Sequence, residues 1–333
     1  MREPDNSRVF RIRDRARAPR RSCTLHGELW ALTAFYNPAH YGNKIENYRR
    51  FHEGLREAGV QLLTIEAAFG TDRFELRRSD ADLLVQVRAK DVLWQKERLL
   101  NVALKHLPSS CDKVAWLDCD ILLMNHDWPA EAARLLDRHP VAQLFSHCVR
   151  LTRDRVWVDP AGLAFGHREG QLFYGIAFGM RAHGVENLNR FTVAGHTGFA
   201  WAARRSLLES HGLYDANPLG GGDMDIAQAL WGNSDYFTLY MRGPGARRHV
   251  RRWATSVHAD VKGNVSYVPG LLLHLWHGDH KDRLYDRWKG ILEDFDPFHD
   301  LTVDPATGLY RWNQVEEHLR EWSAAYFQLR KEE

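Results

Sequence analysis

Two carboxylates interrupt an apolar segment at residues 113–124 (KVAWLDCDILLM). The apolar residues predict a strand that is buried on both faces. Because side chains alternate along a strand with a period of two, Asp118 and Asp120 project to the same side. Two adjacent carboxylates offer the hard oxygen ligands that Mg²⁺ and Mn²⁺ take together with the phosphate oxygens of a nucleotide. A solvated Asp-x-Asp in a strand-to-turn connection has the same pattern, so other segments must supply the rest of a metal site.

Three glycines precede a second acidic pair at residues 220–225 (GGGDMD), where a helix is predicted to begin. Glycine allows a loop to adopt unusual backbone angles and a substrate to approach the main chain. Asp223 has the chemistry of a general base, because a carboxylate accepts the proton of an attacking hydroxyl. Asp225 is expected to orient the acceptor or to support the loop. Simple capping of the helix N-terminus by these carboxylates is the alternative.

A third group of polar residues ends the apolar segment that starts at Leu271. His274 and His277 are candidates for a third metal ligand, because a neutral imidazole binds Mn²⁺ and complements two carboxylates. A histidine that only forms hydrogen bonds at a strand end is the alternative. Lys281 follows, and we expect it to meet a diphosphate as a point charge.

Strands and helices alternate in the first part of the chain. The apolar pattern predicts strands at 28–38, 60–65 and 113–117 and helices at 44–58 and 92–107. This order predicts a parallel sheet with right-handed crossovers, and ligands bind outside the carboxyl ends of such strands. Donor contacts are therefore predicted for four polar residues at these ends: Thr33, Tyr36, Asn37 and Glu66.

The rest of the chain is less regular. Residues 150–189 are rich in Gly, Phe, His and Arg without clear periodicity, and we interpret them as an irregular insertion that carries acceptor specificity. A strand of small residues near 197–203 is predicted to pass close to a ligand. Further helices are predicted at 204–210, 283–292 and 312–329.

The composition is that of an ordinary globular protein, with 44% hydrophobic and 26% charged residues among 333. A formal net charge of +2 does not by itself indicate a polyanionic partner. Arginines crowd residues 1–24, which are predicted to form a flexible basic arm. A modified nucleic-acid base is an open possibility for the acceptor, given this arm and four further arginines: Arg247, Arg248, Arg251 and Arg252. Arginine patches equally suit phosphorylated sugars or solvent.

No apolar run is long enough to span a bilayer, and the arginine-rich start has no apolar core typical of a secretory signal. We therefore expect a soluble, cytoplasmic protein without a transmembrane segment. The four cysteines are scattered without Cys-x-x-Cys spacing, which argues against a zinc cage or a disulfide framework.

Four local segments, in this order, resemble one family of enzymes. Residues 98–103 (RLLNVA) are similar to its Lys-Leu-Leu-Asn helix, and residues 117–125 (LDCDILLMN) to its Asp-Val-Asp strand, whose second aspartate, here Asp120, holds the metal. Residues 198–225 resemble its acceptor segment ending in Gly-Gly-Glu-Asp-x-Asp, with Gly222 in place of the glutamate. Residues 277–281 (HGDHK) are similar to its His-Ser-x-Asp-Lys segment. The chain thus resembles the metal-dependent GT-A glycosyltransferases, most closely the β-1,4-galactosyltransferase and chondroitin-synthase-like group.

This resemblance implies an α/β, GT-A (Rossmann-like) fold, with a mostly parallel central sheet flanked by helices and an irregular acceptor-side insertion. It implies a catalytic domain at 25–295. The nucleotide-sugar half of this domain would cover 25–125 and the acceptor half 126–295. A C-terminal helical extension at 296–333 would follow.

The implied reaction moves a hexosyl or N-acetylhexosaminyl group from a nucleotide-diphosphate sugar, such as a UDP-sugar, to a saccharide or another hydroxyl acceptor. The implied cofactor is Mn²⁺ (or Mg²⁺), held by Asp118, Asp120 and His277, with His274 as the alternative ligand. Further donor contacts are expected from Arg98, Asn101, Asp118 and Lys281. We predict an inverting transfer with Asp223 as the base. A retaining transferase, a nucleotidyltransferase and an inactive nucleotide-sugar-binding module are the alternatives.

Overall fold

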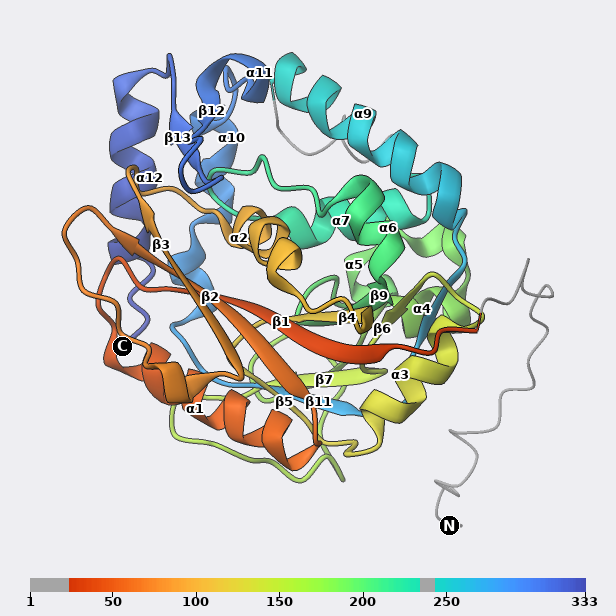
Figure 1. The fold of residues 1–333 in the computed structure, drawn as a ribbon. Helices are drawn as coiled ribbons and strands as arrows, with labels where there is room; N and C mark the ends of the chain where they lie inside the picture. Colours follow the sequence, from red (N-terminus) through yellow and green to blue (C-terminus); the bar gives the residue numbers. More distant parts are fainter. Residues whose placement is uncertain (1–23, 234–242) are drawn as a thin grey trace, which may run out of the picture.

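A seven-stranded sheet lies at the centre of the folded molecule (Figure 1). The computed structural model describes residues 24–233 and 243–333, so the predicted basic arm lies almost wholly outside the described residues. The strand order is β10-β6-β9-β4-β1-β2-β3. The strands are β1 (Glu28–Tyr36), β2 (Gln61–Phe69), β3 (Leu83–Ala89), β4 (Cys111–Leu117), β6 (Val141–Gln143), β9 (Ala200–Arg204) and β10 (Val265–Tyr267). Only β9 is antiparallel to its neighbours, which confirms the predicted α/β class with a mostly parallel sheet.

Two helices make the first crossovers of the sheet. Helix α1 (Gly42–Glu57) joins β1 to β2, and α2 (Lys96–Ala103), extended by the 3-10 turn η3 (Leu104–His106), precedes β4. The second helix begins later than the predicted Val92. Tertiary hydrogen bonds hold the preceding residues in a loop, because the Trp94 amide donates to Pro218 and the Gln95 side chain accepts from the Tyr310 amide.

A second, four-stranded sheet has the order β5-β11-β7-β8. Its strands are β5 (Ile121–Leu123), β7 (His147–Arg150), β8 (Leu172–Tyr174) and β11 (Leu271–His274). The antiparallel register of β11 with β5 sets His274 opposite Ile121, and the parallel register with β7 sets it opposite Arg150. This sheet therefore brings residues near 120, 150 and 274 together.

The predicted insertion at 150–189 is irregular only in its first half. Residues 151–171 form turns and one isolated bridge, between Phe165 and Leu172. Regular elements follow: β8, α4 (Ile176–His183), the 3-10 turn η4 (Val185–Asn187) and α5 (Phe191–Ala194). These short elements escaped the sequence analysis because a helix of two turns has too few residues to establish a period.

Apolar side chains pack on both faces of the central sheet. One face is covered by α2, α6 (Arg205–His211), α7 (Gly222–Leu230), α9 (Pro244–Val261) and α12 (Glu317–Leu329). The other is covered by α1, α3 (Trp128–Leu136) and the second sheet, and Figure 1 shows α1 and α3 below the central strands. No helix within residues 24–233 and 243–333 is long and apolar enough to cross a membrane.

The segment 296–333, predicted as a helical extension, shares the core of the preceding chain. Helix α12 begins at Glu317 rather than at the predicted residue 312, and its Tyr326 and Phe327 belong to the same apolar cluster as residues of α2 and α7. Before it come α11 (Pro297–Asp300) and a small sheet of β12 (Leu301–Val303) and β13 (Tyr310–Trp312). The helix predicted at 283–292 is instead divided into η5 (His280–Arg283), η6 (Tyr285–Arg287) and α10 (Trp288–Ile291).

The core position of α3 gives a stability prediction. Trp128 is 1% exposed in the layer beneath the central sheet, whereas Trp157 is 57% exposed. We expect Trp128→Ala to lower the free energy of unfolding by about 3–5 kcal/mol, because it leaves a cavity. Trp157→Ala should change it by less than about 0.5 kcal/mol. Urea denaturation followed by circular dichroism measures both, and equal losses would contradict this packing.

Candidate active site

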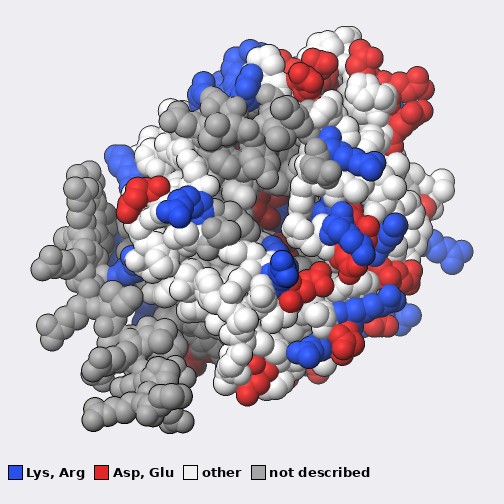
Figure 2. Space-filling view, turned by 180° about the vertical axis from the view of Figure 1, so that it is seen from behind, with Lys and Arg blue, Asp and Glu red and all other residues white. Residues whose placement is uncertain are grey.

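A pocket of about 510 Å³ opens at the carboxyl ends of β1 and β4. This is the edge at which open α/β sheets bind ligands. Figure 2 shows a hollow in one face of the molecule with acidic atoms inside it. Of the predicted site residues, six line the pocket: Tyr36, Asp118, Asp120, Asp223, His274 and His277.

A carboxylate and two imidazoles meet at one end of this pocket. Asp120 lies between β4 and β5, His274 ends β11, and His277 follows three residues later. The Nε2 atoms of the two histidines are 3.0 Å apart, and they lie 3.7 and 3.5 Å from the carboxylate oxygens of Asp120. The Leu275 amide donates to the Asp120 carbonyl, so a backbone hydrogen bond holds the two segments that carry these side chains together.

These three residues fit a divalent metal. Their ligand atoms all lie within 4.8 Å of one another, and Asp120 Oδ1 is buried without a hydrogen-bond partner in the described part of the chain. Adjacent ligands of an octahedral ion stand about 3 Å apart when each bond is about 2.1 Å. Two nitrogen donors suit Mn²⁺ better than Mg²⁺, which prefers oxygen. The donor set therefore favours Mn²⁺ among the predicted cofactors.

Burial keeps both histidines in the neutral form that a metal requires. It lowers the pKa of His277 to about 4, with the Arg283 guanidinium adding to the effect. Burial, with His277 and Arg150 nearby, holds the pKa of His274 well below its usual value. Burial and the neighbouring Asp118 raise the pKa of Asp120 to about 7, a shift that a bound cation opposes.

The ring of His274 is fixed by an aromatic neighbour that the sequence analysis did not identify. Phe199 stacks between His274 and His196, with ring centroids 4.5 and 3.7 Å away. Its φ of +79° is unusual for a residue with a side chain, and such strained backbone often occurs at functional sites. The Phe199 carbonyl also accepts a hydrogen bond from the Asp118 amide, which ties β9 to the end of β4.

Asp118, predicted as a metal ligand, lies outside the cluster. The Nζ atom of Lys96 stands 3.0 Å from Asp118 and 2.8 Å from Asp223, and so bridges the two carboxylates. Burial favours a neutral Lys96, but the nearby Asp118 and Asp223 raise its pKa well above the usual value. The ammonium group is therefore charged and joins the ends of β4, α2 and α7.

Lys96 was missed by the sequence analysis, because the helix was predicted to begin at Val92 and the lysine then fell inside it. In the structure Lys96 is the first residue of α2, where the helix dipole disfavours a cation. A lysine at that position needs carboxylates from elsewhere, and only the folded chain shows where they come from.

The glycine loop places Asp223 at the pocket. Gly221 precedes α7 with a φ of +85°, a left-handed conformation that glycine adopts without strain. A Cβ atom at Gly198 would lie 2.6 Å from Asp223 Oδ2, so this glycine leaves room for the carboxylate. A Cβ at Gly222 would likewise lie 2.6 Å from the side chain of Glu97.

Glu97 is a buried acid that sequence reasoning did not single out. It is 2% exposed, and burial together with the charge of Asp223 raises its pKa to about 7. Its carboxyl group packs against Gly222, the residue that replaces an acidic residue of the resembled family. A second acid, contributed by α2, is therefore buried beside Lys96, although it does not line the pocket itself.

Asp225 supports the loop and does not line the pocket. It is 1% exposed and accepts a hydrogen bond of 2.7 Å from Asn217 Nδ2. Of its two predicted roles, the structure favours support of the loop over contact with an acceptor.

Three residues predicted to contact the donor instead form hydrogen bonds with backbone groups of the protein. Thr33 donates to the Leu117 carbonyl, Asn37 accepts from the Tyr41 amide, and Glu66 accepts from the amides of Glu75 and Leu76. All three are buried, and none lines the pocket. Thr33 and Glu66 lie inside β1 and β2 rather than at their ends, and the polar atoms of all three residues satisfy backbone groups.

Arg98, Asn101 and Lys281 also lie away from the pocket. Arg98 and Asn101 hold Asp215 at 3.2 and 2.8 Å beside a separate cavity. The Lys281 side chain is 76% exposed and pairs with Asp279 at 3.1 Å. The structure thus places these three side chains outside the pocket that holds Asp120 and Asp223.

Four other cations line the pocket: Lys44, Arg150, Arg283 and Arg330. Arg283 and Arg330 both donate to Glu332, and Lys44 lies 3.7 Å from the same carboxylate. Burial alone would raise the pKa of Glu332, but Lys44 and His277 lower it to about 2. By contrast, the arginines of α9 do not line the pocket, and Arg248 pairs with Asp296.

No protein-family model and no curated protein matches the sequence. Among solved structures, Staphylococcus aureus TarS (residues 1–349) is similar over 70% of this chain and 72% of its own, with 13% identity and a TM-score of 0.38. The glucosyl-3-phosphoglycerate synthase of Mycobacterium tuberculosis is similar over 74% of this chain and 73% of its own, with 13% identity and a TM-score of 0.36. The catalytic domain of Drosophila β1,4-galactosyltransferase 7, in complex with xylobiose, is similar over 89% of this chain and 98% of its own, with 11% identity and a TM-score of 0.34.

The cluster predicts a metal affinity that depends on Asp120. We expect Asp120→Asn to weaken Mn²⁺ binding by at least about 100-fold, because it removes a charged ligand rather than an outer partner. Isothermal titration calorimetry of the purified protein measures this. Asp279→Asn, on the exposed surface near His277, is the matched control and should bind Mn²⁺ like the original protein. Unchanged affinity in Asp120→Asn would exclude this carboxylate as a ligand.

Proposed function

We propose that the protein transfers a sugar from a nucleotide-diphosphate sugar to an acceptor hydroxyl, with Mn²⁺ bound by Asp120, His274 and His277. One observation carries the proposal: this cluster and the Asp223–Lys96 pair open into the same pocket. A metal site next to a separate carboxylate base supplies the two functions that an inverting transfer needs. The resemblance of the sequence motifs supports the same chemistry.

The leaving group is expected at the metal end of the pocket. When bound, Mn²⁺ would offset the charge that develops on the departing diphosphate. The cations Lys44, Arg283 and Arg330 line this end, and we assign them the contact expected of Lys281. Their guanidinium and ammonium groups suit phosphate oxygens. A UDP-sugar is the donor that we favour from the family resemblance.

The acceptor is expected beside Asp223. This carboxylate would take the proton from the attacking hydroxyl as that oxygen bonds to the anomeric carbon. Lys96 holds one oxygen of Asp223 at 2.8 Å and thereby fixes the direction of the base. A saccharide is the acceptor class that we favour, because Trp276, Tyr285 and Trp288 line the pocket with rings that suit the apolar faces of sugars.

The reaction class is tested by incubating the protein with Mn²⁺, a panel of nucleotide sugars and saccharide acceptors. The proposal expects release of a nucleoside diphosphate. Release of pyrophosphate would instead identify a nucleotidyltransferase, and binding of the nucleotide sugar without turnover would identify an inactive module. NMR of the product separates inversion from retention at the anomeric carbon. Transfer of a hexosyl or N-acetylhexosaminyl group to the acceptor would complete the proposed assignment.

Asp223 gives the sharpest test of the mechanism. We expect Asp223→Asn to lower turnover by about 100-fold or more, because general-base catalysis contributes that much. Binding of Mn²⁺ and of the nucleotide should persist, since neither is assigned to this carboxylate. Asp127→Asn, an exposed aspartate before α3, is the control and should keep full turnover. Full turnover in Asp223→Asn would overturn its role as the base.

A further inference from the structure

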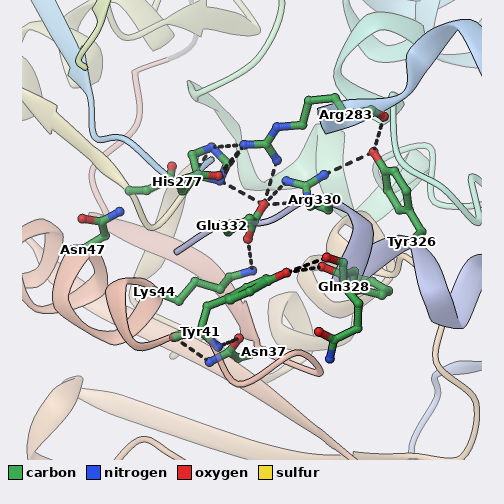
Figure 3. Close-up of polar contacts among 12 residues, drawn as sticks. Asn37, Tyr41, Lys44, Asn47, His277, Arg283, Tyr326, Gln328, Arg330 and Glu332 are labelled. Atoms are coloured by element: carbon green, nitrogen blue, oxygen red, sulfur yellow. Dashed lines mark hydrogen bonds and ion pairs between the residues drawn. The ribbon is translucent and has the colours of Figure 1, made fainter. Parts of the chain in front are cut away.

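Glu332 is buried although the residues on both sides of it are exposed. Its side chain is 2% exposed, whereas that of Lys331 is 70% exposed. The carboxylate accepts hydrogen bonds from Arg283 Nη1 at 2.7 Å and from Arg330 Nε, and Lys44 approaches its other oxygen (Figure 3). Groups from α1, η5 and the segment after α12 therefore meet on one carboxylate.

The same carboxylate reaches the metal cluster. Glu332 Oε1 lies 3.2 Å from Nδ1 of His277, on the side of the ring opposite the metal-facing Nε2. Arg283 Nη2 lies 3.0 Å from Nδ1 and 3.1 Å from Nε2, so this donor faces both ring nitrogens about equally and does not select between them. An acceptor-only carboxylate requires the proton to be on Nδ1, which leaves the lone pair of Nε2 free.

The backbone around His277 is held against the same segment. Arg283 Nη2 donates to the His277 carbonyl at 2.7 Å. The next residue, Gly278, has a φ of +93°, and a Cβ there would lie 2.8 Å from the Arg330 carbonyl. The loop of the metal ligand and the segment that carries Glu332 are thus in direct contact.

We propose that Glu332 is the positioning residue of the metal site. Its carboxylate accepts the Nδ1 proton of His277 and so directs the Nε2 lone pair toward Asp120 and His274. Carboxylates that bond a metal-ligating histidine in this way fix its tautomer and raise its basicity. The inference rests on the proposed function for the metal itself, but the contact of Glu332 with His277 is a property of the metal-free chain.

The first experiment compares Mn²⁺ affinities by calorimetry. We expect Glu332→Gln to raise the dissociation constant about 10- to 100-fold, and Glu332→Ala to raise it at least as much. Glu333→Gln is the matched control: this neighbouring carboxylate accepts from the Gly42 amide at an exposed position, and its loss should leave the affinity unchanged. Thermal melting of each metal-free variant shows whether the fold persists at the titration temperature. Equal affinities in folded protein and variants would overturn the proposal.

The second experiment needs no metal. The ring-nitrogen NMR shifts of His277, assigned by comparison with His277→Gln, report which nitrogen carries the proton. The proposal expects Nδ1–H in the original protein and a shift toward Nε2–H in Glu332→Ala. Nε2–H in the original protein would overturn it. If the protein bound no Mn²⁺ at all, the proposed metal-dependent function would fail, and the NMR result would still decide the role of Glu332.

Discussion

The pairing of β11 with β5 is the constraint on which the site depends. It places Leu272, Leu273 and His274 opposite Leu123, Leu122 and Ile121, and the Leu275 amide extends the ladder to the Asp120 carbonyl. Asp120 and His274, some 150 positions apart in the sequence, thereby become neighbours in the candidate metal site. A shift of one residue in this register would turn His274 to the opposite face of the sheet. The apolar residues that flank His274 oppose such a shift, because they are buried in the present register.

Once this pairing is made, the charges of the pocket must be compensated in a small volume. Lys96 serves this purpose between Asp118 and Asp223, and Glu332 does so among Arg283, Arg330 and Lys44. Removing one member of such a buried group leaves its partners unpaired. The loss in the free energy of unfolding is then larger than the net stabilisation that the pairing contributes. The ion pairs therefore fix the positions of α1, α2, α7 and the segment after α12 relative to the central sheet.

The alternating strands and helices of residues 28–117 and the carboxylate and histidine motifs could be predicted from the sequence, because those depend on local patterns. Asp120 and His277 stood after apolar runs and Asp223 after three glycines at a helix start, and the structure places all three at one pocket. Thr33, Asn37 and Glu66 stood in similar positions but satisfy backbone groups, a difference that local spacing does not encode. Lys96 and Glu332 could not be predicted, since their roles arise from contacts between segments distant in the chain.

The two ends of the pocket differ in charge, and this difference gives the proposed transfer a direction. At the metal end, the four cations Lys44, Arg150, Arg283 and Arg330 outnumber the carboxylates of Asp120, Glu169 and Glu332. At the other end, Lys96 faces Asp118 and Asp223, with the acid Glu97 beside them. By this charge difference, the diphosphate of the proposed donor would be stabilised at the first end and repelled at the second. A donor sugar bound between them would therefore point its anomeric carbon away from the cations and toward Asp223, where a hydroxyl can be deprotonated.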